Sequence, residues 1–158
     1  MKGDQKVIEY LNKALKLELT TVNQYFLHAR MYKDWGFERL AKIEYDESID
    51  EMKHADELIE RILYLEGLPN LQDLDKLYIG ETLKECIEAD LKAEERAHPL
   101  YKDGIEYCES VRDYVSRDIL SRILESEEGH IDFLETQLSL ISKIGEERYM
   151  QSQMKSDG

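Results

Sequence analysis

The sequence predicts an all-α protein, a four-helix bundle with a long crossover between the second and third helices and a short fifth helix at the C-terminus. Apolar residues recur at steps of three and four through four long segments, which is the period of an amphipathic helix. Only 2 prolines and 8 glycines occur in 158 residues, too few for the many tight turns of an all-β fold. With 42% hydrophobic residues, a chain of this length can bury a substantial core. We therefore expect one domain over residues 1–158.

The helix boundaries follow from the breaks between the periodic segments. Helices are expected at about 5–35, 38–66, 82–111 and 114–144, with a short one near 146–154. The break at 34–36 is long enough only for a tight turn, so the first two helices must be antiparallel neighbours. The break at 111–113 joins the third and fourth helices in the same way.

A longer segment, of about 14 residues from Gly67 to Gly80, separates the two helix pairs. At roughly 3.3 Å per residue it can run the ~45 Å length of a 30-residue helix, which predicts a crossover along the bundle. A linker to a second domain is the alternative, but the segment is too apolar for a free tether. Its apolar residues are Leu68, Leu71, Leu74, Leu77 and Ile79. We expect it to pack along the bundle.

Charge and composition exclude several classes of protein. Lys and Arg number 21 against 35 Asp and Glu, so the formal net charge is −14, which excludes a basic nucleic-acid-binding protein. No stretch approaches the roughly 18 consecutive apolar residues of a membrane span, and the N-terminus has no signal-peptide core. We therefore expect a cytoplasmic protein. Cys86 and Cys108 lack CxxC spacing, which argues against a structural disulfide or a thiolate zinc site.

Four glutamates and two histidines form a repeated pattern on the apolar faces of the predicted helices. The first and third helices each carry one glutamate inside an apolar stripe, and the second and fourth each carry a Glu-x-x-His pair that shares one face. The interval from the lone glutamate to the pair is identical in the two halves of the chain, and one constant offset relates all members of the pattern. Hairpin geometry therefore brings all six side chains to the same height at mid-bundle. The six are Glu18, Glu51, His54, Glu94, Glu127 and His130.

This pattern predicts a site for two metal ions. Four ionised carboxylates buried together would each cost several kcal/mol, so cations must compensate them. Oxygen and imidazole donors suit iron or manganese better than calcium. A single Glu-x-x-His on an acidic helix is usually a solvated face, but two copies in register favour the di-iron ligand set of ferritin-like bundles. His28 and His98 have no such setting, and we leave them out of the site.

Seven short motifs carry a resemblance to a known family. They are residues 1–4 (MKGD), 23–28 (NQYFLH), 44–45 (EY), 47–56 (ESIDEMKHAD), 65–72 (LEGLPNLQ), 113–118 (DYVSRD) and 127–132 (EEGHID). By these motifs the chain resembles the bacterioferritin family over essentially its whole length. The resemblance implies a ferritin-like domain and a homo-oligomeric shell of 24 subunits, which oxidises Fe(II) with O2 or peroxide and stores ferric mineral inside.

The resemblance also assigns roles to the six ligands. They would form a ferroxidase centre within each subunit that holds two iron ions. Glu51 and Glu127 would bridge the two ions, and each ion would also take one terminal glutamate and one histidine. Tyr25, two turns from Glu18 on the same stripe, is either a hydrogen-bond partner of a ligating carboxylate or an ordinary core tyrosine.

Met52 is the residue on which the resemblance places a second cofactor. It follows Glu51, so it points about 100° away from the metal face toward the outside of the bundle. In the family the matching methionines of two subunits bind one haem b between them, which passes electrons inward to release iron, with a small ferredoxin as donor. The haem pocket would be lined by Leu19, Asn23, Phe26, Tyr45, Ile49 and Lys53.

Some positions depart from the family pattern. Many members have histidine where this chain has Asp46 and a carboxylate where it has Ser126. Those positions, with Asp50, would form an accessory iron site on the inner surface, so that site is in doubt. Positions that match the lining of pores are Asp34, Glu66, Asp132 and Thr136, with Arg148 and Gln151 near the four-fold axis.

Three other interpretations remain open from the sequence. The first is a soluble di-iron oxidase acting on an organic substrate, although the small chain has no insert for a substrate channel. The second is a peroxide-reducing relative of rubrerythrin, but two cysteines cannot build a four-cysteine rubredoxin module. The third is a haem-carrying subunit in a mixed shell.

Overall fold

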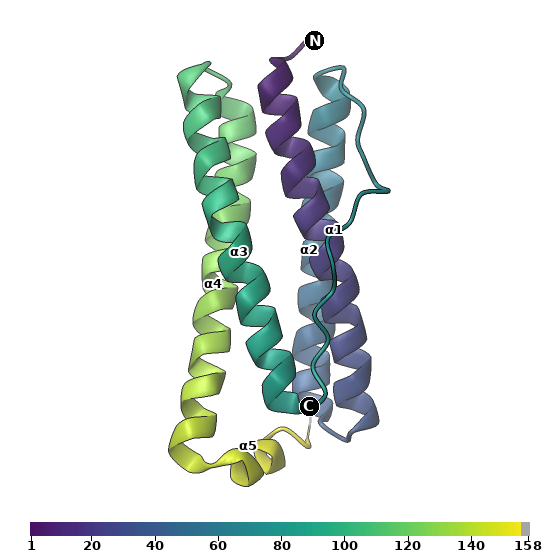
Figure 1. The fold of residues 1–158 in the computed structure, drawn as a ribbon, viewed down its shortest axis with the longest axis vertical. Coiled ribbons are helices and arrows are strands. Elements are labelled where there is room, and N and C mark those ends of the chain that lie inside the picture. Colours follow the sequence, from purple (N-terminus) through teal and green to yellow (C-terminus); the bar gives the residue numbers. More distant parts are fainter. Residues whose placement is uncertain (156–158) are drawn as a thin grey trace.

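The computed structural model describes residues 1–155 and contains five helices (Figure 1). Their bounds lie within two residues of those expected from the sequence, and the predicted all-α bundle is confirmed. The helices are α1 Gln5–Asp34, α2 Glu38–Tyr64, α3 Leu83–Ser110, α4 Tyr114–Ile144 and α5 Glu146–Ser152. No helix in the described part of the chain is long and apolar enough to cross a membrane.

The bundle consists of two antiparallel hairpins, α1 with α2 and α3 with α4 (Figure 1). The chain descends α1, ascends α2, returns to the lower end through the crossover, and then ascends α3 and descends α4. α1 and α3 therefore run in opposite directions, and the two hairpins are related by an approximate two-fold axis across the bundle. α5 lies across the lower end.

Short-range side-chain bonds explain where three helices begin. The Asp4 carboxylate accepts from the backbone N–H groups of Lys6 and Val7 at the start of α1. The Thr82 hydroxyl caps α3, and the Asp113 carboxylate caps α4. Gly36, with φ of 92°, supplies the left-handed residue that the turn between α1 and α2 requires.

Backbone hydrogen bonds hold the crossover against α1. The N–H groups of Asp75, Tyr78 and Gly80 donate to three α1 side chains spaced four residues apart. These acceptors are Thr20, Gln24 and His28. The packed crossover is confirmed, but the reason differs from the expected one. Four of the five apolar side chains counted in the segment are exposed, and Leu68 exposes 84% of its surface.

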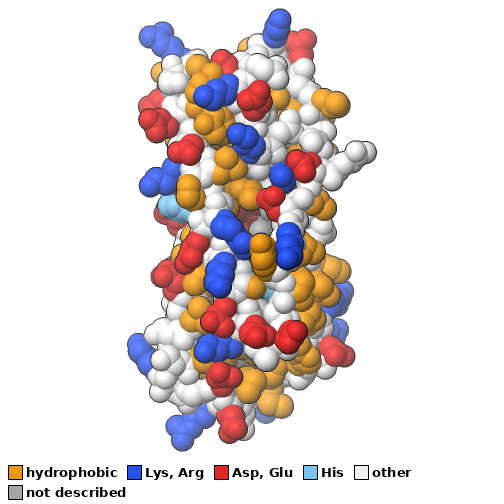
Figure 2. Space-filling view, in the orientation of Figure 1, with side chains coloured by type: hydrophobic (Ala, Val, Ile, Leu, Met, Phe, Trp, Pro, Cys, Tyr) orange, Lys and Arg blue, Asp and Glu red, His pale blue; other side chains and the backbone are white. Residues whose placement is uncertain are grey.

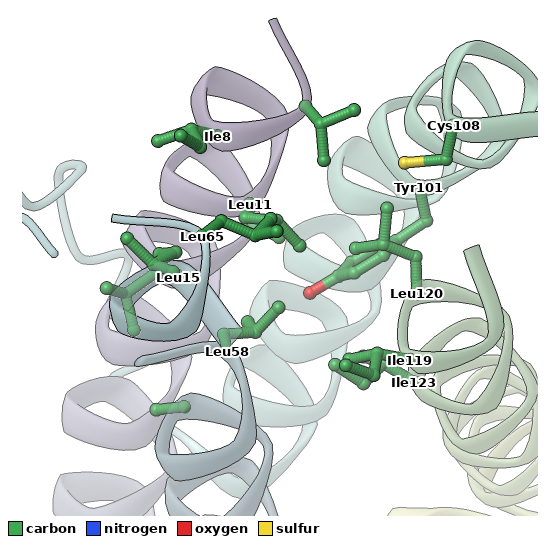
Figure 3. Close-up of a cluster of buried hydrophobic side chains, with 14 of the residues drawn as sticks. Ile8, Leu11, Leu15, Leu58, Leu65, Tyr101, Cys108, Ile119, Leu120 and Ile123 are labelled. Carbon is green, nitrogen blue, oxygen red and sulfur yellow. The ribbon is translucent and has the colours of Figure 1, made fainter. Parts of the chain in front are cut away.

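Two hydrophobic clusters fill the upper and lower parts of the bundle. The upper cluster includes Leu11, Leu58 and Ile123, and the ring of Tyr101 lies among them with its hydroxyl directed toward the middle of the bundle (Figure 3). The lower cluster includes Leu40 and residues of α3, α4 and α5. Outside, Lys and Arg are interspersed with Asp and Glu over the face formed by α1, α3 and the crossover (Figure 2).

Candidate metal centre

All six predicted ligands meet at mid-bundle, from four different helices. Each of the four glutamates exposes 2% or less of its surface, although each lies in a stripe of otherwise apolar residues. His130 is also buried, and His54 is partly buried. The contributors are Glu18 from α1, Glu51 and His54 from α2, Glu94 from α3, and Glu127 and His130 from α4. The structure thus brings together the residues that the repeated spacing predicts.

The first half of the centre is assembled around His54. Its Nδ1 atom lies 3.5 Å from Glu18 Oε1. The same atom lies 3.9 Å from Glu51 Oε2 and 3.9 Å from Glu127 Oε1. One ligand atom from each of these four residues lies within 4.8 Å of all the others, so the group could hold a metal ion.

The second half is assembled around His130 and contains a residue that the sequence analysis missed. His130 Nδ1 lies 3.1 Å from Glu94 Oε1 and 3.4 Å from Glu47 Oε1. Glu47, Glu51 and His130 form a second group that could hold a metal ion. Glu47 lies one turn before Glu51 on the same face of α2, and this four-residue spacing was the signal that could have identified it.

Two tyrosines orient the terminal glutamates crosswise between the hairpins. The Tyr25 hydroxyl on α1 donates to Glu94 Oε1 on α3. The Tyr101 hydroxyl on α3 donates to Glu18 Oε1 on α1 at 2.6 Å. The interpretation of Tyr25 as a partner of a carboxylate is confirmed. Tyr101 was missed, although in the second half it occupies the position equivalent to that of Tyr25 in the first.

Burial and their mutual contact shift the pKa values of Glu94 and His130 in the second half. Burial, opposed by His130, raises the pKa of Glu94 to about 7. Burial alone would lower the pKa of His130, but its hydrogen bond to Glu94 and the charge of Glu94 raise it to about 9. At neutral pH His130 therefore carries a proton that a metal ion must displace.

Several donor atoms of the centre are buried without a hydrogen-bond partner. They are His54 Nδ1, Glu94 Oε2 and Glu127 Oε1. Buried polar atoms are rarely left unpaired, and each unpaired atom destabilises the fold by about 1–3 kcal/mol. A divalent cation held by the first group would satisfy His54 Nδ1 and Glu127 Oε1, whereas Glu94 lies outside both groups and reaches the centre through its contact with His130. The residues present therefore fit two metal ions, with Glu51 belonging to both groups.

A second buried cluster lies toward the lower end of the bundle and was not predicted. It consists of His28, Glu44 and Asp90, with His28 Nδ1 2.9 Å from Asp90 Oδ1. Its members come from three helices, but Asp90 lies one turn before Glu94 and Glu44 two turns before Glu51, so the spacing that marks Glu47 could also have indicated these two. The other histidine left out of the site, His98, forms an exposed pair with Glu128 at 2.7 Å.

The residues expected at a haem site lie together on the outer face of α1 and α2. Met52 exposes 47% of its surface, and Phe26, Tyr45 and Ile49 are also exposed. The Phe26 and Tyr45 rings lie 5.9 Å apart. An exposed thioether beside aromatic and aliphatic side chains fits an apolar macrocycle whose iron takes a methionine ligand.

The inner-surface and pore residues remain predictions. Asp50 lies outside the groups in residues 1–155 that could hold a metal ion. Lys42 Nζ lies 3.0 Å from Asp46 Oδ2, so one carboxylate oxygen of Asp46 already has a partner. The pore candidates Asp34, Glu66, Asp132, Thr136, Arg148 and Gln151 all keep some or much of their surface accessible.

Comparison with known proteins defines the class of this fold and centre. Residues 8–144 match the family model described as a ferritin-like domain, so the chain is a ferritin-like protein.

Three relatives narrow this class further. Bacterioferritin of Brucella melitensis is 59% identical over 151 residues, which cover 96% of this chain and 94% of that protein. Bacterioferritin of Rhodobacter capsulatus is 53% identical over 145 residues, covering 92% and 90%. Bacterioferritin BfrA of Mycobacterium tuberculosis is 50% identical over 149 residues, covering 94% of each. The chain belongs to the bacterioferritins, and the resemblance drawn from its motifs is confirmed.

Proposed function

We propose that the chain is the subunit of a cytoplasmic iron-storage protein that oxidises Fe(II) at its buried centre and keeps ferric mineral inside a shell of 24 subunits. Membership of the bacterioferritins supports iron storage. The observation that carries the ferroxidase proposal is the pair of buried carboxylate and histidine groups that share Glu51. Their unpartnered donor atoms suit a divalent ion as substrate.

The arrangement suits oxidation because it holds two substrate ions side by side. Each Fe(II) gives up one electron, so an adjacent pair supplies two electrons to O2 together. Glu51 and Glu127 would hold the ions at a fixed separation. Tyr25 and Tyr101 fix the terminal carboxylates, so little reorganisation is needed when the ions arrive.

The Glu94–His130 contact makes occupation of the second half pH-dependent. His130 Nδ1 must lose its proton before it can bind an ion. Because the pKa of His130 is about 9, Fe(II) binding there should strengthen as pH rises from 6 to 8. A Co(II) titration followed by absorption at several pH values measures this without oxidation.

Replacing ligands tests the assignment of the centre. Glu94→Ala and His130→Ala should slow the fast phase of aerobic Fe(II) oxidation at least about tenfold, the usual scale of effect when a metal site is disturbed. Glu95→Ala removes an exposed carboxylate from the adjacent position on α3 and is the matched control. Size-exclusion chromatography shows whether each variant assembles. Unchanged rates in assembled ligand variants would refute the assignment.

Iron retention distinguishes storage from a stoichiometric cofactor. After aerobic Fe(II) addition, particles isolated by size exclusion should hold many more than two iron ions per chain. Saturation at two per chain would instead support the alternative of a di-iron oxidase acting on an organic substrate.

We also propose that Met52 is an axial ligand of haem b shared between two subunits, with a small ferredoxin as electron donor. When bound, the haem supplies one-electron transfer toward the stored iron. Met52→Leu should abolish the haem absorbance and leave Fe(II) oxidation unchanged. Met154→Leu changes another exposed methionine and should retain haem. Full haem occupancy in Met52→Leu would refute the proposed role of Met52 as a haem ligand.

A further inference from the structure

The buried cluster of His28, Glu44 and Asp90 is the largest set of titratable groups that the proposed ferroxidase chemistry leaves unused. His28 and Asp90 are fully buried, and Glu44 exposes 4% of its surface. Asp90 Oδ1 accepts hydrogen bonds from Gln24 Nε2 at 2.9 Å and from His28 Nδ1 at 2.9 Å. Asp90 lies one turn before Glu94 on α3, so the cluster adjoins the metal centre.

The crossover fixes which nitrogen of His28 carries the proton. The backbone N–H of Gly80 donates to His28 Nε2 at 3.1 Å, so Nε2 must present its lone pair. In the neutral ring the proton then resides on Nδ1, where it is donated to Asp90. Nδ1 has no lone pair left for a metal ion. The cluster is therefore not a third metal site while the crossover is in place.

The two carboxyl groups are each left with an unsatisfied oxygen. Glu44 Oε2 and Asp90 Oδ2 are buried without a partner, and one carboxylate oxygen of each side chain lies within 4.8 Å of the other. Two facing carboxylates cannot both be ionised in a dry site, and a single proton between them satisfies both oxygens. Asp90 already accepts two hydrogen bonds, whereas Glu44 Oε2 has no hydrogen-bond partner.

The pKa shifts of the two carboxyl groups agree with a proton that resides on Glu44 and not on Asp90. Burial, followed by the charge of Asp90, raises the pKa of Glu44 well above its ordinary value. Burial alone would raise the pKa of Asp90, but hydrogen bonds from Glu44, His28 and Gln24 lower it. The remaining titratable groups around Glu44 come from three helices. They are Tyr25 and Tyr32 on α1, Glu47 on α2 and Cys86 on α3.

The repeat in the sequence shows that the two ends of the centre differ at this level. At the offset that relates the two halves, the counterparts of His28 and Glu44 are Gly104 and Leu120, and the counterpart of Asp90 is Ala14. All three counterparts are buried in the upper half. The equivalent end of the centre is thus apolar, and the acid pair adjoins only the half that is built around His130.

We propose that Glu44 and Asp90 hold one shared proton while the metal centre is empty and release it to solvent when two divalent cations fill the centre. Two divalent cations bring four positive charges into the centre and displace the one that protonated His130 carries, so the positive charge near the pair rises, and nearby positive charge favours the ionised carboxyl. The Glu44 O–H bond breaks, and the ionised pair then helps to balance the charge of the ions. This inference rests on the proposed metal centre.

Zn(II) tests the proposal because it loads the centre without redox chemistry. Calorimetry in buffers of different ionisation enthalpy gives the number of protons released when two Zn(II) bind per chain. Glu44→Gln keeps a hydrogen-bond donor toward Asp90 but has no proton to release, so it should release one proton fewer than wild type. Glu60→Gln removes an exposed carboxyl from the same helix and should match wild type. Equal release by wild type and Glu44→Gln would overturn the proposal.

Infrared difference spectra give a second readout that does not depend on a variant. At pH 8, where Glu94 with its pKa of about 7 is mostly ionised, the empty wild-type protein should still show the carbonyl stretch of a buried carboxylic acid, and Zn(II) should remove it. A spectrum without this band before loading, or with the band unchanged after two Zn(II) have bound, also overturns the proposal. Failure of Zn(II) to bind at two per chain would instead count against the metal centre itself.

Discussion

Arg61 connects the end of the first hairpin to the turn of the second, and its removal should destabilise the fold by a calculable amount. Its Nη2 lies 2.9 Å from Asp113 Oδ1, and its Nε donates to Ser116 Oγ at 2.9 Å. The Arg61 and Asp113 side chains are only 11% and 14% exposed. In Arg61→Met, Asp113 keeps its bonds to Ser116 but loses its positive partner.

The magnitude follows from these two bonds. The charged guanidinium donates both bonds, and a hydrogen bond to a charged group contributes about 1.5–3 kcal/mol, so the free energy of unfolding should fall by at least about 3 kcal/mol. Urea unfolding followed by circular dichroism, at one fixed subunit concentration because the protein is expected to be oligomeric, measures it.

A double-mutant cycle isolates the ion pair itself. Arg61→Met combined with Asp113→Asn should show a coupling of at least about 1 kcal/mol, as expected for residues in direct contact. Arg117→Met removes an exposed pair with Asp118 and should cost less than about 1 kcal/mol. A coupling indistinguishable from zero would refute the view that Arg61 fastens the two hairpins together.

Three further predictions concern the buried groups and the crossover. Because the folded-state pKa of Glu44 is raised, this group should lower wild-type stability as pH rises above 4.5, by about 1.4 kcal/mol per unit until the raised pKa is reached. Glu94, with its pKa of about 7, adds a slope of the same sign, so urea midpoints of Glu44→Gln measured against pH should show a slope shallower than that of wild type by the Glu44 share. Burial raises the pKa of Cys86 to about 12 and that of Cys108 to about 11, so an aromatic disulfide reagent should label neither thiol in native protein and both in urea. A Cβ added to Gly80 would overlap the backbone of Cys86, so Gly80→Ala should shift the crossover and speed hydrogen exchange at the residue 80 amide, whereas exchange at wild-type rate would show that the site can relax.

The helices and the mid-bundle meeting of the six candidate residues were predictable because their signals are local or periodic. Caps such as Asp4 and Thr82 lie within three residues of the groups they satisfy, and the repeated interval between lone glutamate and Glu-x-x-His fixes the height of each ligand through hairpin geometry. Glu47 and Tyr101 were also within reach of the same spacing rules.

Other features depend on contacts between distant parts of the chain. Asp90 pairs with His28 of the other hairpin, and helical spacing gives the height of each residue but not its partner. The exposed leucines of the crossover are a second case in which a local pattern did not predict the packing. Their apolarity suggested burial, but backbone bonds to α1 decide how the segment lies.

The crosswise tyrosines make metal binding a reporter of tertiary assembly. Each terminal glutamate is oriented by a tyrosine of the other hairpin, so neither hairpin alone contains a complete half of the centre. A ligand that binds only the assembled form stabilises it in proportion to the logarithm of its concentration over its dissociation constant. Divalent ions should therefore clamp the two hairpins together, and the loss of bound metal during unfolding would mark the moment at which they separate.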